Sequence, residues 1–132
     1  MADGSVLVTW TRNDSNLLMG TNGAGSQVLS RSWNSTNQSW SPPQTLVADL
    51  PNRLSQSLSG TSNRAVYVWT RDIDGVLTNA NDQQVFRCEW TNGVWGAAQQ
   101  FTTNSLGIRN ARVSVASSGD VYLVWQQASN LV

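Results

Sequence analysis

The chain of 132 residues contains no histidine and no lysine, and it has a single cysteine, Cys88. Histidine is the most common general base near neutral pH and the most common zinc ligand, so the usual forms of both sites are missing. One cysteine excludes an internal disulfide and a thiolate metal cluster. We therefore expect no catalytic residues, no metal site and no cofactor.

Charge is also scarce, because charged residues make up 12% of the chain and eight arginines balance eight acidic residues. A neutral chain has no electrostatic footprint for nucleic acid or anionic lipid. No apolar run is long enough to cross a bilayer, and no signal-peptide pattern precedes the apolar run at 6–8. The sequence predicts neither a nucleic-acid partner nor membrane insertion. Residues 1–4 resemble a translation start added just before a strand, as expected for an excised or engineered part of a longer protein.

The sequence contains an internal repeat. The segment 3–10 recurs without a gap at 118–125, and 64–69 ends in the same tryptophan between them. Further segments keep this period: 27–33 with 84–90, 40–46 with 95–101, and 53–55 with 112–114. We expect one domain over 1–132, with approximate repeats at 5–63 and 64–120 and with 116–132 duplicating 1–17.

The repeated segments have the composition of strands. Val66–Trp69 and Val121–Trp125 are apolar at consecutive positions, which is typical of strands buried on both faces. Pro42 and Pro43 indicate an edge strand or its entry, because proline donates no ladder hydrogen bond. Turn residues separate the segments at 74–75, 91–93 and 117–119. The sequence predicts an all-β protein.

Four strands per repeat is the arrangement of a β-propeller blade. We expect an innermost strand A at 54–59 and 113–117, followed by a strand B that ends in Trp10, Trp69 or Trp125. Strand C ends at Trp33 or Trp90, and the edge strand D starts at Trp40 or Trp95. The chain would run B-C-D, A-B-C-D, A-B, which gives nine strands in two four-stranded blades with overlapping terminal strands.

Two blades are too few to close a propeller, which needs about four to eight. Their apolar flanks would stay open, although blade contacts are where such repeats gain stability. We therefore expect homo-oligomerisation, with three copies giving six blades or four copies giving eight. The duplicated terminal strand offers a route by strand exchange. A monomeric two-sheet sandwich is the alternative.

The hairpin at 85–96 carries Trp90 and Trp95 around an Asn-Gly turn, and Trp33 and Trp40 repeat this pair. It resembles blades of sialidase-like and related bacterial surface propellers, and it is equally similar to tryptophan-rich propeller lectins of bacteria and fungi. The sialidase Asp-box is only echoed at 32–40, where Asn34 replaces the aspartate and the glycine is missing. The resemblance implies a parent protein outside the cell or on its surface, and the departure argues against the catalytic family proper.

The tryptophans have two interpretations. Trp10, Trp69 and Trp125 end the B strands, and we expect them in the core. The four outer-hairpin rings would be partly exposed and could stack on a sugar, with amide groups nearby as hydrogen-bond partners. These candidate ligand contacts are Trp33, Trp40, Trp90, Trp95 and Asn92. Packing between blades is the alternative for each of them.

Arg53 and Arg112 begin the innermost strands at positions that the sequence aligns. The sialidase resemblance implies an arginine cluster that binds the substrate carboxylate there; anchoring of a loop through backbone carbonyls is the alternative, and we favour it. A sialidase also needs a tyrosine nucleophile with a glutamate partner. Only Tyr67, Tyr122 and Glu89 are available, and both tyrosines lie in apolar strands, so we predict no catalysis.

Two further features have conventional explanations. Asp72-Ile73-Asp74-Gly75 resembles half of a calcium loop, but the pattern is not completed, and we expect a solvated turn. Cys88 aligns with Arg31, so we expect its thiol to be partly exposed to solvent and to have no chemical role.

Together these patterns predict a non-catalytic binding or scaffold module, with itself and a secreted or surface glycan as partners. An inactive fragment of a sialidase-like hydrolase is one alternative. A purely structural unit, engineered to test how propellers arise from repeats, is the other.

Overall fold

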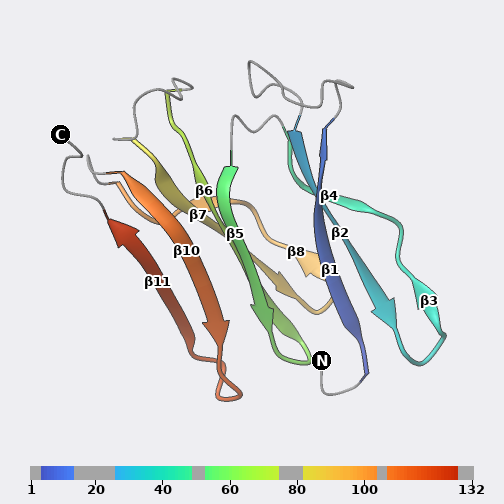
Figure 1. Ribbon diagram of the computed structural model, residues 1–132. Coiled ribbons are helices and arrows are strands. Elements are labelled where there is room, and N and C mark those ends of the chain that lie inside the picture. The colour runs from blue at the N-terminus through green and yellow to red at the C-terminus, as the bar shows by residue number, and fades with distance from the viewer. Residues whose placement is uncertain (1–3, 14–25, 49–52, 75–81, 104–106, 128–132) are drawn as a thin grey trace.

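The computed structural model describes residues 4–13, 26–48, 53–74, 82–103 and 107–127; of Asn13, Ser26, Arg53 and Leu54 it describes the backbone alone (Figure 1). These residues form eleven strands and no helix, so no described helix could span a membrane. The strands are β1 (Val6–Asn13), β2 (Ser26–Asn34), β3 (Ser39–Trp40), β4 (Gln44–Val47), β5 (Arg53–Gly60), β6 (Arg64–Arg71), β7 (Gln84–Thr91), β8 (Val94–Trp95), β9 (Gln99–Gln100), β10 (Ile108–Val115) and β11 (Val121–Gln127). The all-β prediction is confirmed.

The described strands form three antiparallel sheets. The first sheet has the order β1-β2-β3, with β4 also pairing β2, and the second has the order β5-β6-β7-β8, with β9 also pairing β7. The third sheet is the β10-β11 pair. The strand order matches the sequence prediction, but the outer strand of each larger sheet is split in two, because 41–43 and 96–98 leave the ladder. In the first sheet Pro42 and Pro43 account for the break.

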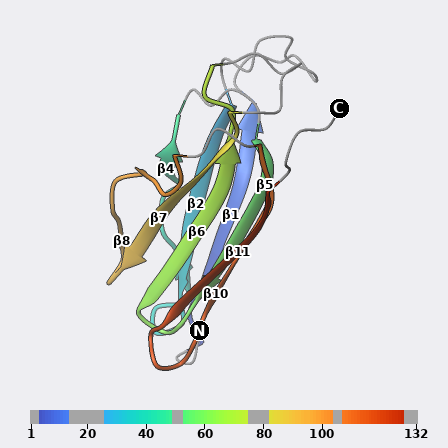
Figure 2. The same cartoon turned by 90° about the vertical axis from the view of Figure 1, so that its left-hand side faces the viewer.

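The second sheet lies between the other two (Figure 1). The short strands β4 and β8 lie along one edge of the stack and β5 along the opposite edge (Figure 2). Within the described chain the stack does not close into a barrel or ring. Each sheet contact has its own apolar cluster: Val28 of the first sheet packs with Tyr67, Trp69 and Cys88, and Val66 and Val68 pack with Ile108, Ala111 and Val113.

Strand β6 is buried on both faces, as predicted. Tyr67 and Trp69 lie in the cluster with the first sheet, whereas Val66 and Val68 lie in the cluster with the third. All four are at most 1% exposed. The consecutive apolar residues of this strand therefore follow from a sheet on either side of it.

The same prediction is wrong for β11. Leu123 and Trp125 pack on the second sheet, but Tyr122 is 61% exposed and Val124 is 63% exposed. Trp10, which we expected in the core, is 36% exposed. Both differences have one cause: β1 and β11 belong to the end sheets, which have a neighbour on one side only.

Serine hydroxyls join the second and third sheets at their edges. The backbone N–H groups of alternate β10 residues donate to the side chains of alternate β5 residues. These bonds run from Ala111 to Ser55 at 3.1 Å, from Val113 to Ser57 at 3.3 Å and from Val115 to Ser59 at 2.9 Å. The edge N–H groups of β10 are therefore satisfied without a neighbouring strand in the same sheet.

Candidate functional site

Three of the predicted ligand contacts line one groove. A groove of about 320 Å³ lies between the hairpin turns of the first and second sheets, and Trp33, Trp90 and Asn92 form part of its wall. The remaining lining residues are Ser5, Ser32, Asn34, Ser62, Asn63 and Gly93. All of these side chains are uncharged, so the lining combines two tryptophans with amide and hydroxyl groups. This combination suits a neutral polyhydroxyl ligand, whose apolar ring face stacks and whose hydroxyls form hydrogen bonds.

The groove is framed by tight turns. Asn92 and Gly93 both have positive φ, at 50° and 91°, and they turn β7 into β8. Asn34 caps the equivalent turn, because its Oδ1 accepts the N–H of Thr36 at 2.9 Å and that of Asn37 at 3.3 Å. Asparagine tolerates these roles because its short side chain bonds to the nearby backbone. The sequence therefore places amides at this end of the sheets through turn chemistry.

Trp40 and Trp95 lie outside the groove lining. The Trp33 and Trp40 rings are 5.5 Å apart, and Trp40 is 41% exposed. Trp95 instead joins two sheets, because its Nε1 donates to Ser30 Oγ on β2 at 2.8 Å. Trp95 is therefore part of the sheet contact. The expected partial exposure is wrong for Trp90, which is 8% exposed, because it lies on the same face of β7 as Cys88, toward the first sheet.

The two arginines are not equivalent, so the alignment of Arg53 with Arg112 is wrong. Arg53 lies opposite Arg71, two residues after Trp69, and Arg112 lies opposite Val124, the residue before Trp125. The Arg112 side chain is exposed and donates to the backbone carbonyl of Ala111 at 2.9 Å. The Arg53 side chain lies outside the described part of the structure. Arg112 does not line the groove.

The residues considered for catalysis lie in other interactions. Glu89 forms ion pairs with Arg64 at 2.9 Å and with Arg87 at 3.3 Å. Tyr67 is buried and donates its hydroxyl to Gln56 at 2.6 Å, whereas Tyr122 lies on the open face of the third sheet. Arg64 also donates to the Gly119 carbonyl at 2.8 Å, so the Glu89 cluster ties the second sheet to the third.

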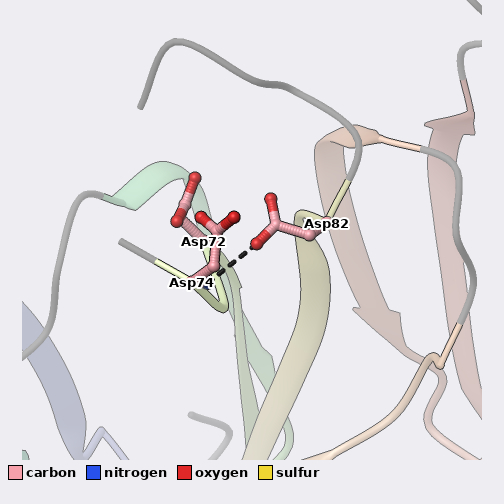
Figure 3. Close-up of side chains that lie close together, drawn as sticks. All are labelled: Asp72, Asp74 and Asp82. Atoms are coloured by element: carbon pink, nitrogen blue, oxygen red, sulfur yellow. Dashed lines mark hydrogen bonds between the residues drawn. The ribbon is translucent and has the colours of Figure 1, made fainter. Parts of the chain in front are cut away.

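An acidic cluster lies at the end of β6 (Figure 3). Carboxylate oxygens of Asp72, Asp74 and Asp82 lie within 4.8 Å of one another, so among the described residues these three could hold a cation. Asp82 Oδ2 accepts the N–H groups of Asp74 at 2.8 Å and Ile73 at 3.2 Å. The solvated turn that we expected is wrong for Asp72, which is 1% exposed and lies beside the Asp82 carboxylate.

Cys88 is not partly wet, as its alignment with Arg31 had indicated, but 2% exposed. Burial raises the pKa of its thiol to about 12, and the Glu89 carboxylate adds to the shift. The alignment misled because Cys88 lies in the cluster between the first two sheets, whereas Arg31 packs against Trp40 on the open side of the first sheet. A thiol with this pKa is a poor nucleophile.

Sequence reasoning missed the polar half of the groove and the third carboxylate. Asn34 and Asn63 were not selected, although each lies in a turn at the same end of the strands, and the antiparallel order brings those turns together. Asp82 was missed because it lies ten residues after Asp72 in the sequence. Its position two residues before β7 was the available signal.

A scan against models of known protein families finds no match, and a search of curated proteins finds none either. The function must therefore be inferred from the chain itself.

Proposed function

We propose that the chain is a non-catalytic β-propeller binding and scaffold module, and that its copies assemble head to tail into a closed ring. The observation that supports this is that the two end faces of the stack repeat the two faces that are buried at its centre. We define the head face as the open side of the first sheet and the tail face as the open side of the third.

The head face consists of Val6, Val8 and Trp10, which are 45%, 37% and 36% exposed. Counting back from the repeated tryptophan, these residues correspond to Ala65, Tyr67 and Trp69 of the second sheet. Those three are only 2%, 1% and 1% exposed, because they face the preceding sheet. The head face is therefore built to pack on a preceding sheet, and the described chain has none there.

The tail face consists of Tyr122 and Val124, and it corresponds in the same way to Val66 and Val68. Val66 and Val68 are 0% exposed, because the third sheet covers them. Burying a large apolar side chain contributes on the order of 2 kcal/mol, so two open faces forgo a substantial share of the stability of a small domain.

The head face corresponds to one side of the contact between neighbouring sheets, and the tail face corresponds to the other side. A second copy can therefore supply the sheet that each face lacks. Such a contact is heterologous and generates a ring when the rotation closes. Propellers close with about four to eight blades. If the third sheet of one copy and the first sheet of the next together form one blade, each copy contributes two blades, so three copies would give six blades and four copies eight.

A charge on the head face tests the proposal. We expect the natural chain to form a multimer and Val8→Asp to form a monomer, because an aspartate buried without a partner opposes association. Val94→Asp is the matched control: Val94 is 68% exposed on β8 and lies on neither end face. A Val8→Asp chain with the mass of the natural multimer would contradict the proposal.

Glycan binding at the groove is the second part of the proposal, and the uncharged wall with Trp33, Trp90 and Asn92 favours it. We expect a glycan array to yield a neutral saccharide that Trp33→Ala no longer binds. Phe101→Ala removes a ring that is 44% exposed and does not line the groove, so binding should persist. Silence across diverse sugars would favour the purely structural unit, and an inactive sialidase-like fragment would show its ligand at an arginine cluster instead.

A further inference from the structure

We propose that, in the assembly, β10 of one copy pairs with β1 of the next copy and that β1 thereby replaces β11 as the partner of β10. This strand exchange rests on the proposed ring and specifies its contact: once β11 is released, the head face of the next copy packs on Val66 and Val68 of the second sheet, where β11 lay, and not on the tail face. It would complete the first sheet of each copy with the edge strand that this sheet lacks.

The first sheet is one strand short of the second. In the second sheet β5 pairs the open edge of β6, whereas in the first sheet β1 is the last strand, and no described strand pairs its other edge. The third sheet has the strand that the first sheet lacks, because β10 corresponds to β5. Its second strand, β11, repeats the sequence of β1. The chain therefore carries one edge strand without a full sheet and one sheet without its edge strand.

The repeat gives the register of the exchanged pair. Within the chain, Val113 lies opposite Leu123, Ser114 opposite Tyr122 and Val115 opposite Val121. The ungapped match of 3–10 with 118–125 places Val8, Leu7 and Val6 of the next copy at those three partner positions. Each substitution exchanges apolar residues, so the pairing preserves the apolar character of the strand.

A cavity lies where the incoming strand would run. Its volume is about 240 Å³, and it opens between the start of β1 and the β5–β6 turn. It is lined by Ser5, Val6, Leu7, Leu58, Ser59, Gly60 and Ala65. Val6 and Leu7 are residues that the exchanged strand would pair with, and Gly60 and Ser59 belong to the edge strand it would lie against.

Ser114 supplies the matching polar group. Ser59 lies opposite Val66, and Ser114 lies opposite Tyr122, so the two serines hold the same register position in β5 and β10. Ser59 accepts the N–H of Val115, which is one residue beyond Ser114 on its strand. By the same geometry Ser114 would accept the N–H of Gly60 of the next copy, and the serine contact seen within the chain would repeat between copies.

The backbone pairing favours release of β11 over release of β1. β1 is held to β2 over eight residue pairs from Val6 to Asn13 without irregularity. β11 is held to β10 over six pairs, and the register shifts between Arg109 and Arg112. Exchanging β11 for β1 therefore breaks the shorter and less regular ladder, and an equivalent one replaces it.

A disulfide tests the exchange in the full chain. The double variant Leu7→Cys with Ser114→Cys puts two thiols at opposing positions, where the strand spacing of about 5.5 Å suits a disulfide. In a single copy the second sheet separates β1 from β10, so the two thiols cannot meet (Figure 1). We expect oxidation to link the copies covalently and to yield dimers and larger species on a non-reducing gel. Each single variant and the natural chain, whose Cys88 is buried, should form no such ladder.

Mass and cross-linking together separate the inferences. A multimer whose Leu7→Cys/Ser114→Cys chains stay unlinked means that the sheets stack without exchange, which overturns the exchange and leaves the ring. A monomer overturns both. Should that variant not fold, Thr9→Cys with Arg112→Cys offers the neighbouring pair, since Arg112 lies opposite Val124 and Thr9 corresponds to Val124. The off-register pair Leu7→Cys with Arg112→Cys should link at least tenfold less.

Discussion

Ser59 Oγ accepts the backbone N–H of Val115 at 2.9 Å, across the boundary between the second and third sheets. The two residues are 56 positions apart and belong to parallel edges of neighbouring sheets. Ser55 and Ser57 make the same contact further along β5. A period-2 row of serines on one edge strand thus satisfies a period-2 row of N–H groups on the next.

Ser59→Ala should lower the free energy of unfolding by about 1–2 kcal/mol, because the Val115 N–H loses its acceptor in a part-buried place. The measurement is chemical denaturation of both chains. Ser117→Ala in the exposed turn after β10 is the control and should change the value by under about 0.5 kcal/mol. Equal effects of the two substitutions would show that the Ser59 hydroxyl does not stabilise the contact between the second and third sheets.

Gly60→Ala should destabilise the chain by about 1–3 kcal/mol. A Cβ at this position would lie 2.6 Å from the Ala65 Cβ and 2.7 Å from the Arg64 carbonyl oxygen, so the β5–β6 turn must shift. At Gly96 the nearest atom to an added Cβ is the Glu89 carbonyl oxygen at 3.5 Å, so Gly96→Ala should be tolerated. Thermal unfolding of both variants compares them directly, and a Gly60→Ala chain as stable as Gly96→Ala would contradict the close approach.

Trp95→Phe should cost about 1 kcal/mol in the free energy of unfolding beyond the loss of ring area, because Ser30, which is 2% exposed, loses the indole N–H. A double-mutant cycle with Ser30→Ala isolates this contact. Trp40→Phe removes the same group from a ring that is 41% exposed and serves as the control. A coupling energy near zero between Trp95 and Ser30 would show that the hydrogen bond adds nothing to the sheet contact.

Burial of the Cys88 thiol predicts that the folded chain loses stability at alkaline pH. Its folded pKa is raised to about 12 from an ordinary 9.0, so the unfolded chain releases the thiol proton first as pH rises. The stabilisation is complete below about pH 9 and is lost between about pH 9 and 12. At about pH 10 the natural chain should have lost about 1 kcal/mol more than Cys88→Ala, relative to about pH 8. Parallel pH profiles of the two chains would refute a buried thiol.

The sequence was sufficient to predict the strand order and the internal repeat, because both follow from the alternation of apolar runs and turn residues. It was insufficient for the exposure of Trp10 and Val124, since the pattern of a strand is the same whether or not a neighbouring sheet is present. The groove could be predicted in part: Trp33, Trp90 and Asn92 lie in it, but Trp95 bonds to Ser30 instead. Whether a side chain contacts a ligand or packs on a neighbouring sheet depends on how the sheets stack, and the local sequence pattern does not specify that stacking.

The equivalence of Arg53 and Arg112 shows a second limit. Both β5 and β10 contain an irregularity, between Arg53 and Gln56 and between Arg109 and Arg112, so matching residue types does not match ladder positions. Register is set by the paired strand, and the repeated tryptophan of that strand was the better anchor.

The mass of the natural chain in solution tests the central claim most directly. Sedimentation equilibrium at micromolar concentration should give three or four times the 14.4 kDa of one chain, because the open face of the first sheet would then be covered by a neighbouring copy. A single species of 14.4 kDa that persists on concentration would contradict the account.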